Sequence, residues 1–170
     1  MSLIQSFPPL AGADAKCLVL GSIPGVRSLT EQQYYAHPQN AFWRIFAALL
    51  GFDARAPYVE RCAALTGSGI ALWDVLASCR RPGSLDASVE QDSIVANDIA
   101  GFLQSRPTIT AIHFNGALAE KTFLRHILPT LPPAQQSIRR LRLPSTSPAH
   151  AGMRFEEKLA AWRCVVETGR

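Results

Sequence analysis

The segment Cys17-Leu-Val-Leu-Gly-Ser-Ile-Pro-Gly25 decides the fold class. Its first four residues form a short apolar run that stops at a glycine, which is typical of a parallel strand buried on both faces. The two glycines and the proline that follow predict a tight turn whose backbone N–H groups can approach a ligand closely. Because this turn is neither a P-loop nor a dinucleotide-binding loop, it does not by itself name the ligand.

Apolar runs and helical spacings alternate through the rest of the chain. Three further strands are predicted over residues 70–73, 108–114 and 137–143. Helices are predicted over residues 40–51, 97–105, 117–128 and 154–166. One more helix is predicted after Pro57, with Val59, Cys62 and Leu65 facing inward. Residues 80–92 are polar and are expected to form a loop. The alternation predicts an α/β fold: a single three-layer α/β/α domain, residues 1–170 with a core over about 15–166, around a mostly parallel four-stranded sheet.

The composition fits a folded domain of this kind. The chain has 170 residues, of which 48% are hydrophobic and 18% charged, and its mean hydropathy is +0.07. That is enough apolar material for one buried core, and too much for a disordered chain. No apolar run approaches the roughly 18 residues of a membrane span, and residues 1–10 do not resemble a secretion signal. The four cysteines are widely spaced, so we expect a cytoplasmic protein with free thiols and no structural zinc or iron–sulfur cluster.

The positive charge is concentrated near the end of the chain. The sequence carries 17 basic and 13 acidic residues, and residues 136–170 alone hold seven basic and three acidic ones, which accounts for the whole net charge of +4. Six of the seven are arginines, which bind phosphate oxygens through two parallel hydrogen bonds. A polyanionic partner is therefore plausible. An ordinary solvated basic face explains the charge alone at least as well.

Three loops follow predicted strands: residues 21–40, 114–116 and 144–152. In parallel α/β sheets, ligands bind outside the carboxyl ends of the strands, so candidate functional residues are expected in these loops. The last loop contains Pro144-Ser-Thr-Ser-Pro148, whose hydroxyls and free amides could hold a phosphate, while its prolines lower the cost of ordering. A plain surface turn is the alternative reading of that loop, although it lies within the basic segment.

Four motifs in these loops together resemble one family. In chain order they are Gly21-Ser-Ile-Pro-Gly25, Tyr34-Tyr-Ala-His-Pro-Gln-Asn-Ala-Phe-Trp43, Phe114-Asn-Gly116 and Leu143-Pro-Ser-Thr-Ser-Pro148. The set resembles the uracil-DNA glycosylase superfamily, and most of all its hypoxanthine-DNA (deoxyinosine) glycosylase branch. The resemblance spans residues 18–162. It rests on the order of the four motifs at strand ends rather than on any one of them.

The resemblance implies a DNA glycosylase of base-excision repair. Such an enzyme hydrolyses the N-glycosidic bond of a deaminated base, here hypoxanthine, that is flipped out of double- or single-stranded DNA. It implies no metal, no cofactor and no obligate protein partner. Two departures weaken a uracil assignment: Ile23 stands where many relatives have a catalytic Asn or Asp, and Leu143 stands where many have a base-polarising histidine. The hypoxanthine branch shares both departures and is thought to use the asparagine that matches Asn40.

Asn40 is accordingly the expected catalytic residue. Its carbonyl oxygen would orient the attacking water, because an amide is too weak a base to remove a proton outright. A role only as a helix cap is the alternative, and the two roles are compatible. Donors that stabilise the departing base are expected from Ser22 with its neighbouring amides and from Asn115, although Asn115 could simply end a strand. The other residues expected around the base are Ile23, Tyr35 and Phe114.

The DNA backbone is expected to contact the last loop. Pro148 and His150 would enter the minor groove and fill the gap that the flipped base leaves. Ser145 and Ser147 would hold the flanking phosphates, with Arg154 behind them. None of the three lysines lies in a proposed site loop, which favours simple hydrolysis over a Schiff-base lyase.

Three alternative functions remain open at this level. A glycosylase for uracil or for G:U and G:T mismatches could use the same loops. A DNA-binding protein of the same fold without catalytic activity is the alternative that Ile23 keeps open. A small-molecule hydrolase is disfavoured because the sequence has no Gly-x-Ser-x-Gly motif and no plausible metal ligands.

Overall fold

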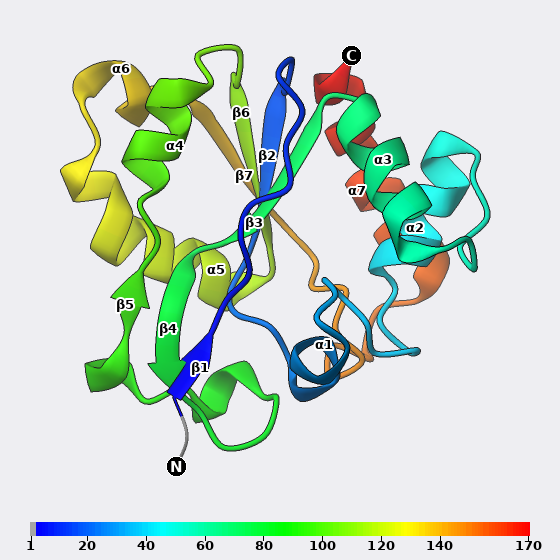
Figure 1. The fold of residues 1–170 in the computed structure, drawn as a ribbon, viewed down its shortest axis with the longest axis horizontal. Helices are drawn as coiled ribbons and strands as arrows, with labels where there is room; N and C mark the ends of the chain where they lie inside the picture. The colour runs from blue at the N-terminus through cyan, green and yellow to red at the C-terminus, as the bar shows by residue number, and fades with distance from the viewer. Residues whose placement is uncertain (1–2) are drawn as a thin grey trace.

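Four parallel strands form the centre of the molecule, which the computed structural model describes over residues 3–170. The strands are β2 (Cys17–Gly21), β3 (Ile70–Asp74), β6 (Ala111–Asn115) and β7 (Arg139–Leu143), and their order in the sheet is β3-β2-β6-β7 (Figure 1). Each predicted strand is therefore present, and the expected parallel four-stranded sheet is confirmed. Strand β6 begins three residues later than predicted, and β7 begins two residues later.

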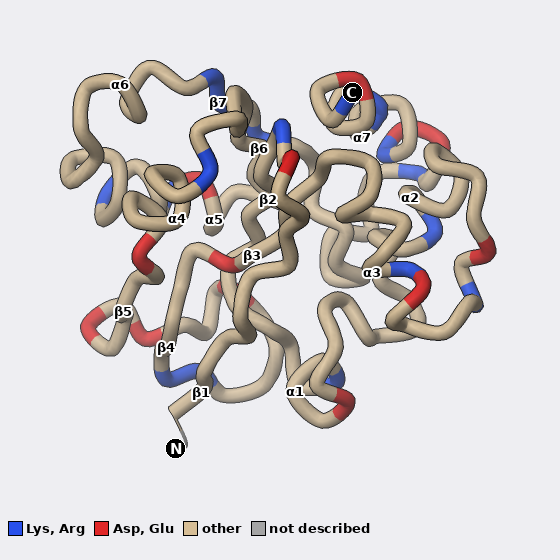
Figure 2. Tube along the Cα trace, turned by 45° about the horizontal axis from the view of Figure 1, so that its top comes forward, with Lys and Arg blue, Asp and Glu red and all other residues tan. Residues whose placement is uncertain are grey.

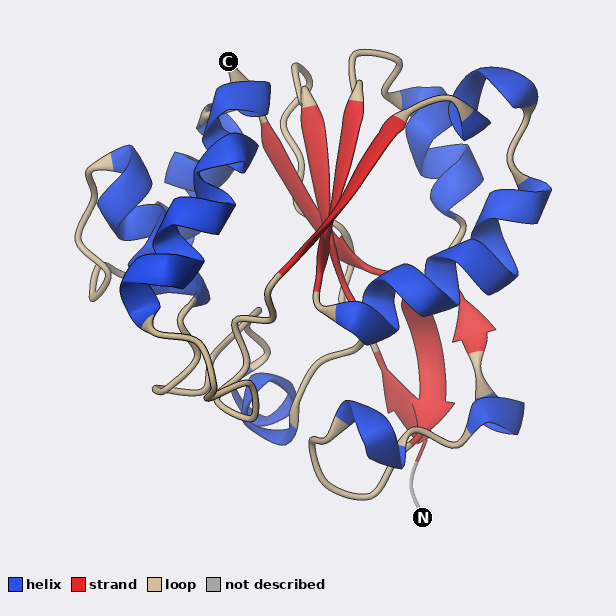
Figure 3. Ribbon diagram, turned by 180° about the vertical axis from the view of Figure 1, so that it is seen from behind, coloured by secondary structure: helices blue, strands red, loops and turns tan. Residues whose placement is uncertain are grey.

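Helices cover both faces of this sheet, which gives the expected three layers (Figure 3). On one face lie α2 (Phe42–Leu50), α3 (Tyr58–Gly67) and α7 (Phe155–Gly169). On the other lie α4 (Ile99–Ser105) and α5 (Ala117–Thr122), which continues as the π-helical turn η3 (Phe123–Ile127). The remaining helices are short: α1 (Val26–Glu31), α6 (Pro133–Gln136), η1 (Asp86–Ser88), η2 (Gln91–Ser93) and η4 (Leu128–Thr130).

The central strand β2 shows why the sheet needs two helical layers. Its residues alternate between two cores, with Cys17 and Val19 on the α2/α3/α7 side and Leu18 and Leu20 on the α4/α5 side. All four side chains are completely buried. A strand that is apolar on both faces gains this burial only when helices cover each face.

An aromatic cluster joins α2 to the loop before it. Phe42 is completely buried and lies at the centre of the cluster. Its ring stacks on that of Tyr35, with 4.1 Å between ring centroids and 20° between ring planes, and meets Trp43 and Trp162 edge to face. The indole N–H of Trp43 donates to the carbonyl oxygen of Tyr34 at 2.8 Å. The packing of α2 therefore fixes the conformation of residues 34 and 35.

A second, antiparallel sheet was not expected from the sequence. It consists of β1 (Leu3–Gln5), β4 (Leu76–Arg80) and β5 (Val95–Ala96), in the order β1-β4-β5. Small and polar residues occupy β4, whose sequence is Leu-Ala-Ser-Cys-Arg, so the strand has no apolar run to reveal it. Residues 81–96, expected as a loop over most of their length, contain η1 and η2 as well as β5.

Two helix predictions need correction in detail. The helix α2 begins at Phe42 rather than directly after Asn40, although Asn40 still accepts a hydrogen bond at its start. Val59 does not face inward: it is 78% exposed, whereas Leu65 on the same helix is completely buried. Within residues 3–170 no helix has both the length and the apolar character that a membrane crossing requires.

Candidate active site

The carboxyl ends of three adjacent strands form the floor of a pocket. Gly21 ends β2, Asp74 ends β3 and Asn115 ends β6, and all three residues line one cavity of about 320 Å³. This is the position at which parallel α/β sheets bind ligands, and the volume lies at the lower end of the roughly 300–1,000 Å³ that is usual for small-molecule sites. A nucleobase is a ligand of suitable size for such a cavity.

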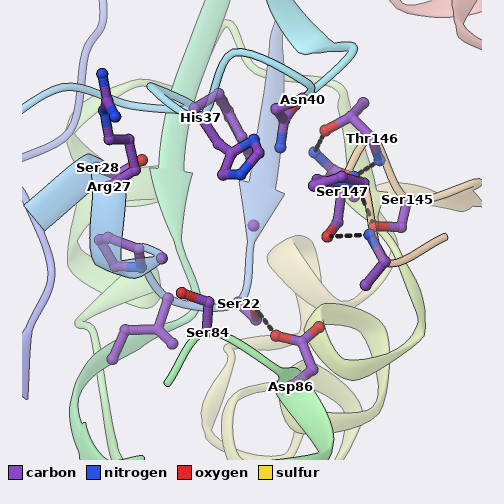
Figure 4. Close-up of a pocket in the computed structure, with 18 of the residues that line it drawn as sticks. Ser22, Arg27, Ser28, His37, Asn40, Ser84, Asp86, Ser145, Thr146 and Ser147 are labelled. Carbon is purple, nitrogen blue, oxygen red and sulfur yellow. Dashed lines mark hydrogen bonds between the residues drawn. The ribbon is translucent and has the colours of Figure 1, made fainter. Parts of the chain in front are cut away.

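Four loop segments form the walls of the pocket (Figure 4). They are residues 21–28, residues 34–40, residues 84–86 and residues 145–150. The structure thus brings together nine of the eleven residues that the sequence predicted for the site. These are Ser22, Ile23, Tyr35, Asn40, Asn115, Ser145, Ser147, Pro148 and His150.

The two other predicted residues do not line the pocket; the prediction for Phe114 is corrected, and the predicted phosphate contact of Arg154 stays a prediction. Phe114 is completely buried in the core on the α4/α5 side of the sheet, against Phe123, so its ring does not reach the pocket. Strand alternation explains this, because Phe114 and its neighbour Asn115 point to opposite faces. Arg154 does not line the pocket either, and its guanidinium pairs with Glu157 at 2.8 Å on an exposed surface.

Asn40 lies at the pocket wall just before α2. Its side-chain oxygen accepts a hydrogen bond from the backbone N–H of Phe42 at 2.9 Å. In Figure 4 its amide nitrogen points toward the pocket. The side-chain oxygen is thus turned toward the start of the helix, and the group that Asn40 presents to the pocket is an NH2, which donates rather than accepts. The capping role is present, and Asn40 can hold a water in the pocket by donating a hydrogen bond to the oxygen of that water, rather than by accepting one as the sequence led us to expect.

Ser22 belongs to the turn that follows β2, and its hydroxyl is already engaged. It donates to a carboxylate oxygen of Asp86 at 2.8 Å, which ties this turn to η1 (Figure 4). The hydroxyl proton is therefore not free for a base, contrary to the expectation for Ser22. The backbone N–H groups of Ser22, Ile23 and Gly25 donate to no other group of residues 3–170, and these residues line the pocket. The turn thus offers amides rather than a hydroxyl.

Arg81 holds the rim of the pocket that residues 24–26 and 83–84 form. Arg81 is 4% exposed, and its guanidinium donates to the carbonyl oxygens of Pro24 at 2.7 Å and Gly83 at 2.8 Å. The hydroxyl oxygen of Ser84 also accepts from the backbone N–H of Val26 at 2.9 Å. These bonds join the turn after β2 and the first residue of α1 to the segment that follows β4, and together they form one rim of the pocket.

Residues 144–150 are held at both ends by α7. The indole N–H of Trp162 donates to the carbonyl oxygen of Pro144 at 2.9 Å, and the buried ammonium of Lys158 donates to that of His150 at 2.7 Å. Burial lowers the pKa of Lys158. In the middle of the loop, the amide of Asn115 both donates to the hydroxyl of Thr146 and accepts from its backbone N–H, each at 2.9 Å. Asn115 therefore positions this loop, a role that the sequence did not suggest.

Asp74 is the site residue that sequence reasoning missed. It is 3% exposed, and its carboxyl oxygen Oδ2 is buried without a hydrogen-bond partner in residues 3–170. Burial, together with the negative charge of Asp86, raises the pKa of Asp74 to about 7, while Arg81 acts in the opposite direction. The available signal was a charged residue directly after the buried run of residues 70–73.

Tyr35 lies next to Asp74 on the pocket floor. A β-carbon at position 21 would lie 2.6 Å from Asp74 Oδ1 and 2.7 Å from the Tyr35 hydroxyl, so only glycine allows both groups to approach there. The Tyr35 hydroxyl is buried without a hydrogen-bond partner in residues 3–170. Burial and the nearby Asp74 raise the pKa of Tyr35, while the neighbouring Asn115 side chain acts in the opposite direction without making a well-formed hydrogen bond, so the hydroxyl stays protonated. Its backbone is left-handed, with φ of 55°, a strained conformation for tyrosine that the stacking on Phe42 maintains.

Replacing Asp74 by asparagine is expected to stabilise the protein at neutral and alkaline pH. The folded-state pKa of about 7 exceeds the ordinary value of 3.8, so between these values only the unfolded state ionises and folding becomes less favourable as pH rises. The free energy of unfolding of Asp74→Asn should equal that of wild type near pH 4. Above pH 7, the free energy of unfolding of the variant should exceed that of wild type by roughly 2–4 kcal/mol. Urea unfolding at several pH values measures the difference, and the exposed Asp14→Asn is the control that should show no such trend.

The Lys and Arg residues near the C-terminus are spread along several elements of the fold (Figure 2), and none of them lines the pocket. Arg139 begins β7 at the opposite end of the sheet, and Arg170 lines a shallow hollow at that same end. Arg142 faces Glu120 at 3.8 Å, and Lys158 is buried. Among the residues that line the pocket, Arg27 is the one Lys or Arg. Local geometry, rather than the total charge, therefore marks the candidate site.

Comparisons with known proteins agree with this site. The family model of the uracil DNA glycosylase superfamily matches residues 8–165. A hypoxanthine DNA glycosylase of Methanosarcina barkeri is 35% identical over 113 residues, which cover 66% of this chain and 70% of that protein. A hypoxanthine DNA glycosylase of Methanosarcina acetivorans is 34% identical over 116 residues, covering 68% and 72%. A solution NMR structure from M. acetivorans, described as a uracil DNA glycosylase, superposes with a TM-score of 0.77 at 29% identity and covers 96% of this chain and 99% of its own.

The family model and the two relatives show that the chain is a DNA glycosylase, the class that the sequence motifs led us to expect, and the three-layer fold with a base-sized pocket at the strand ends agrees with it. The chain belongs to the uracil DNA glycosylase superfamily.

Proposed function

We propose that this protein hydrolyses the N-glycosidic bond of deoxyinosine in DNA and releases hypoxanthine. The observation that carries the proposal is the convergence of Asn40, Asp74 and Asn115 with residues 145–150 on one cavity at the strand ends. The names of the two Methanosarcina relatives support hypoxanthine as the base. Ile23 supports the same choice, because it removes the side chain that many uracil-specific relatives carry in this turn.

The chemical task is to break the bond between C1′ and N9 through an oxocarbenium-like sugar. This needs a base held outside the helix, a positioned water and stabilisation of the charge that develops on the base. The pocket supplies a place for each requirement. The base enters between the wall segments, the sugar lies at the mouth, and Asn40 at the wall holds the water. Positioning, rather than proton removal, is the contribution that an amide can make.

Residues 145–150 form the proposed contact with the DNA backbone. The hydroxyl oxygens of Ser145 and Ser147 accept hydrogen bonds from backbone N–H groups of the same loop, each at 3.2 Å, so their hydroxyl protons remain free to donate to phosphates. Pro148 and His150 follow at the rim and would fill the space that the flipped nucleotide leaves. Arg154 does not line the pocket; it is exposed and pairs with Glu157, and its contact with a flanking phosphate stays a prediction.

We further propose that the enzyme acts by simple hydrolysis. A lyase needs an amine that forms a Schiff base with C1′. The residues that line the pocket include no lysine. Lys158, in the helix that follows the last loop, is buried, and its ammonium donates to the carbonyl oxygen of His150. Water is therefore the nucleophile that this site can present.

A cleavage assay tests the proposed function. Labelled duplexes containing one inosine, uracil or xanthine are incubated with the protein and then divided, with and without alkali. We expect strand breaks in the inosine duplex only after alkali, because hydrolysis leaves an abasic site that alkali cleaves. Cleavage without alkali would indicate a lyase, preference for uracil would overturn the choice of base, and no cleavage of any duplex would leave only DNA binding.

A further inference from the structure

The floor of the pocket carries two buried polar atoms, the Tyr35 hydroxyl oxygen and Asp74 Oδ2, that have no hydrogen-bond partner within residues 3–170. The Tyr35 hydroxyl and the Asp74 carboxyl are both buried and converge around Gly21. Buried polar groups in folded proteins almost always have a hydrogen-bond partner, because an unpaired group loses its water without compensation. Two such groups side by side in a ligand pocket indicate that the ligand provides the missing partner.

The protonation state decides which kind of partner they need. Four neighbouring groups face Asp74: Tyr34 and Tyr35 from the loop before α2, Asp86 from η1 and Arg81 from the segment after β4. The tyrosines stay protonated, Asp86 opposes ionisation of Asp74, and Arg81 bonds to backbone carbonyls rather than to Asp74. Burial and Asp86 raise the pKa of Asp74 to about 7, so the carboxyl group carries its proton below that pH. It is then an O–H donor, as is Tyr35.

A pair of donors suits the leaving group of the proposed reaction. When the C1′–N9 bond breaks, its electron pair moves onto the base, and negative charge builds up on the acceptor atoms N3, N7 and O6 of hypoxanthine. A neutral carboxylic acid and a tyrosine hydroxyl in a dry site are an effective combination for stabilising such a charge. An ionised carboxylate at the same place would repel it.

We propose that Asp74, in its neutral form, and Tyr35 donate hydrogen bonds to the departing base and stabilise it as the glycosidic bond breaks. This inference rests on the proposed function and assigns the leaving-group half of its chemistry. Both residues touch the base and are catalytic in that sense. Asp74 and Tyr35 donate hydrogen bonds but give up no proton. Over the whole reaction, the water that attacks C1′ loses one proton and the released base takes one up, so the sum is the addition of one water.

The test is the pH dependence of the cleavage step. Single-turnover rates on an inosine duplex are measured from pH 6 to pH 9. The enzyme is saturating, so the measured rate does not depend on how tightly the duplex binds. The wild-type rate should fall about tenfold per pH unit above about pH 7, as Asp74 loses its proton. Asp74→Asn keeps an N–H donor that does not titrate. Its rate should be flat, so the ratio of variant to wild type should rise about 10²-fold between pH 7 and pH 9.

Two further variants separate this role from a structural one. Asp74→Ala removes the donor and should lose about 10²-fold or more at every pH, and Tyr35→Phe, which retains the ring that stacks on Phe42, should lose about 10-fold or more. An Asp74→Asn rate that follows the wild-type pH profile, or that is abolished at every pH in a folded protein, overturns the inference. A wild-type protein that cleaves no inosine at any pH overturns the proposed function instead, and the two failures are thereby distinguished.

Discussion

Asn40→Ala is expected to lower the single-turnover rate of inosine cleavage by about 10²-fold or more, because the water then loses the group that orients it. The same change removes the acceptor for the backbone N–H of Phe42, so the free energy of unfolding should also fall by about 1 kcal/mol. Rate measurements with saturating enzyme, together with urea unfolding, report the two effects separately.

Asp98→Ala is the matched control for this variant. The side chain of Asp98 accepts from the backbone N–H of Gly101 at 3.0 Å at the start of α4, and it does not line the pocket. Its removal should cost a similar amount of stability and leave the cleavage rate unchanged. If Asn40→Ala cleaves inosine as fast as Asp98→Ala does, Asn40 is only a helix cap.

Phe42→Ala is expected to be the most destabilising single change in the α2 layer, at about 3–5 kcal/mol. Phe42 is completely buried and contacts four other aromatic rings, so its loss leaves a cavity that the surrounding residues cannot fill. A loss of this size is a large part of the roughly 5–15 kcal/mol that stabilises an ordinary domain. Urea or thermal unfolding measures it directly.

Phe42→Leu distinguishes the cavity from a general effect of mutation at this position. It keeps much of the buried apolar volume and should cost clearly less than the alanine variant. It removes the ring on which Tyr35 stacks, however, so the leucine variant should lose cleavage rate out of proportion to its stability. Equal and small losses of stability for both variants would show that the cluster is not tightly packed.

Most of the central fold followed from the sequence because its strands are buried on both faces. Apolar runs such as residues 17–20 and 70–73 have no reasonable place other than the middle of an α/β/α domain. The antiparallel sheet escaped prediction for the opposite reason. Its strands are short and partly exposed, and β5 has only two residues, so its formation depends on pairing with distant segments that no local pattern reveals.

The candidate site was predictable as a set of loops but not as a set of contacts. Strand ends and motif order located Asn40, Tyr35 and residues 145–150. Phe114 was predicted to face the base because it lies next to Asn115 at the same strand end. Side chains of adjacent strand residues point to opposite faces of the sheet, so only one of the two can face the pocket. Asp74 was missed because its importance lies in what surrounds it: burial and the lack of a partner are properties of the folded chain.

The anchoring of residues 144–150 by Trp162 and Lys158 has a consequence for how a lesion is found. A segment fixed in advance loses little conformational entropy when it meets a duplex, so the cost of distortion falls on the nucleic acid. Base pairs that open easily are then captured faster than stable ones. A mispaired inosine would therefore be selected partly by the weakness of its own pairing, before any atom of the base reaches the cavity.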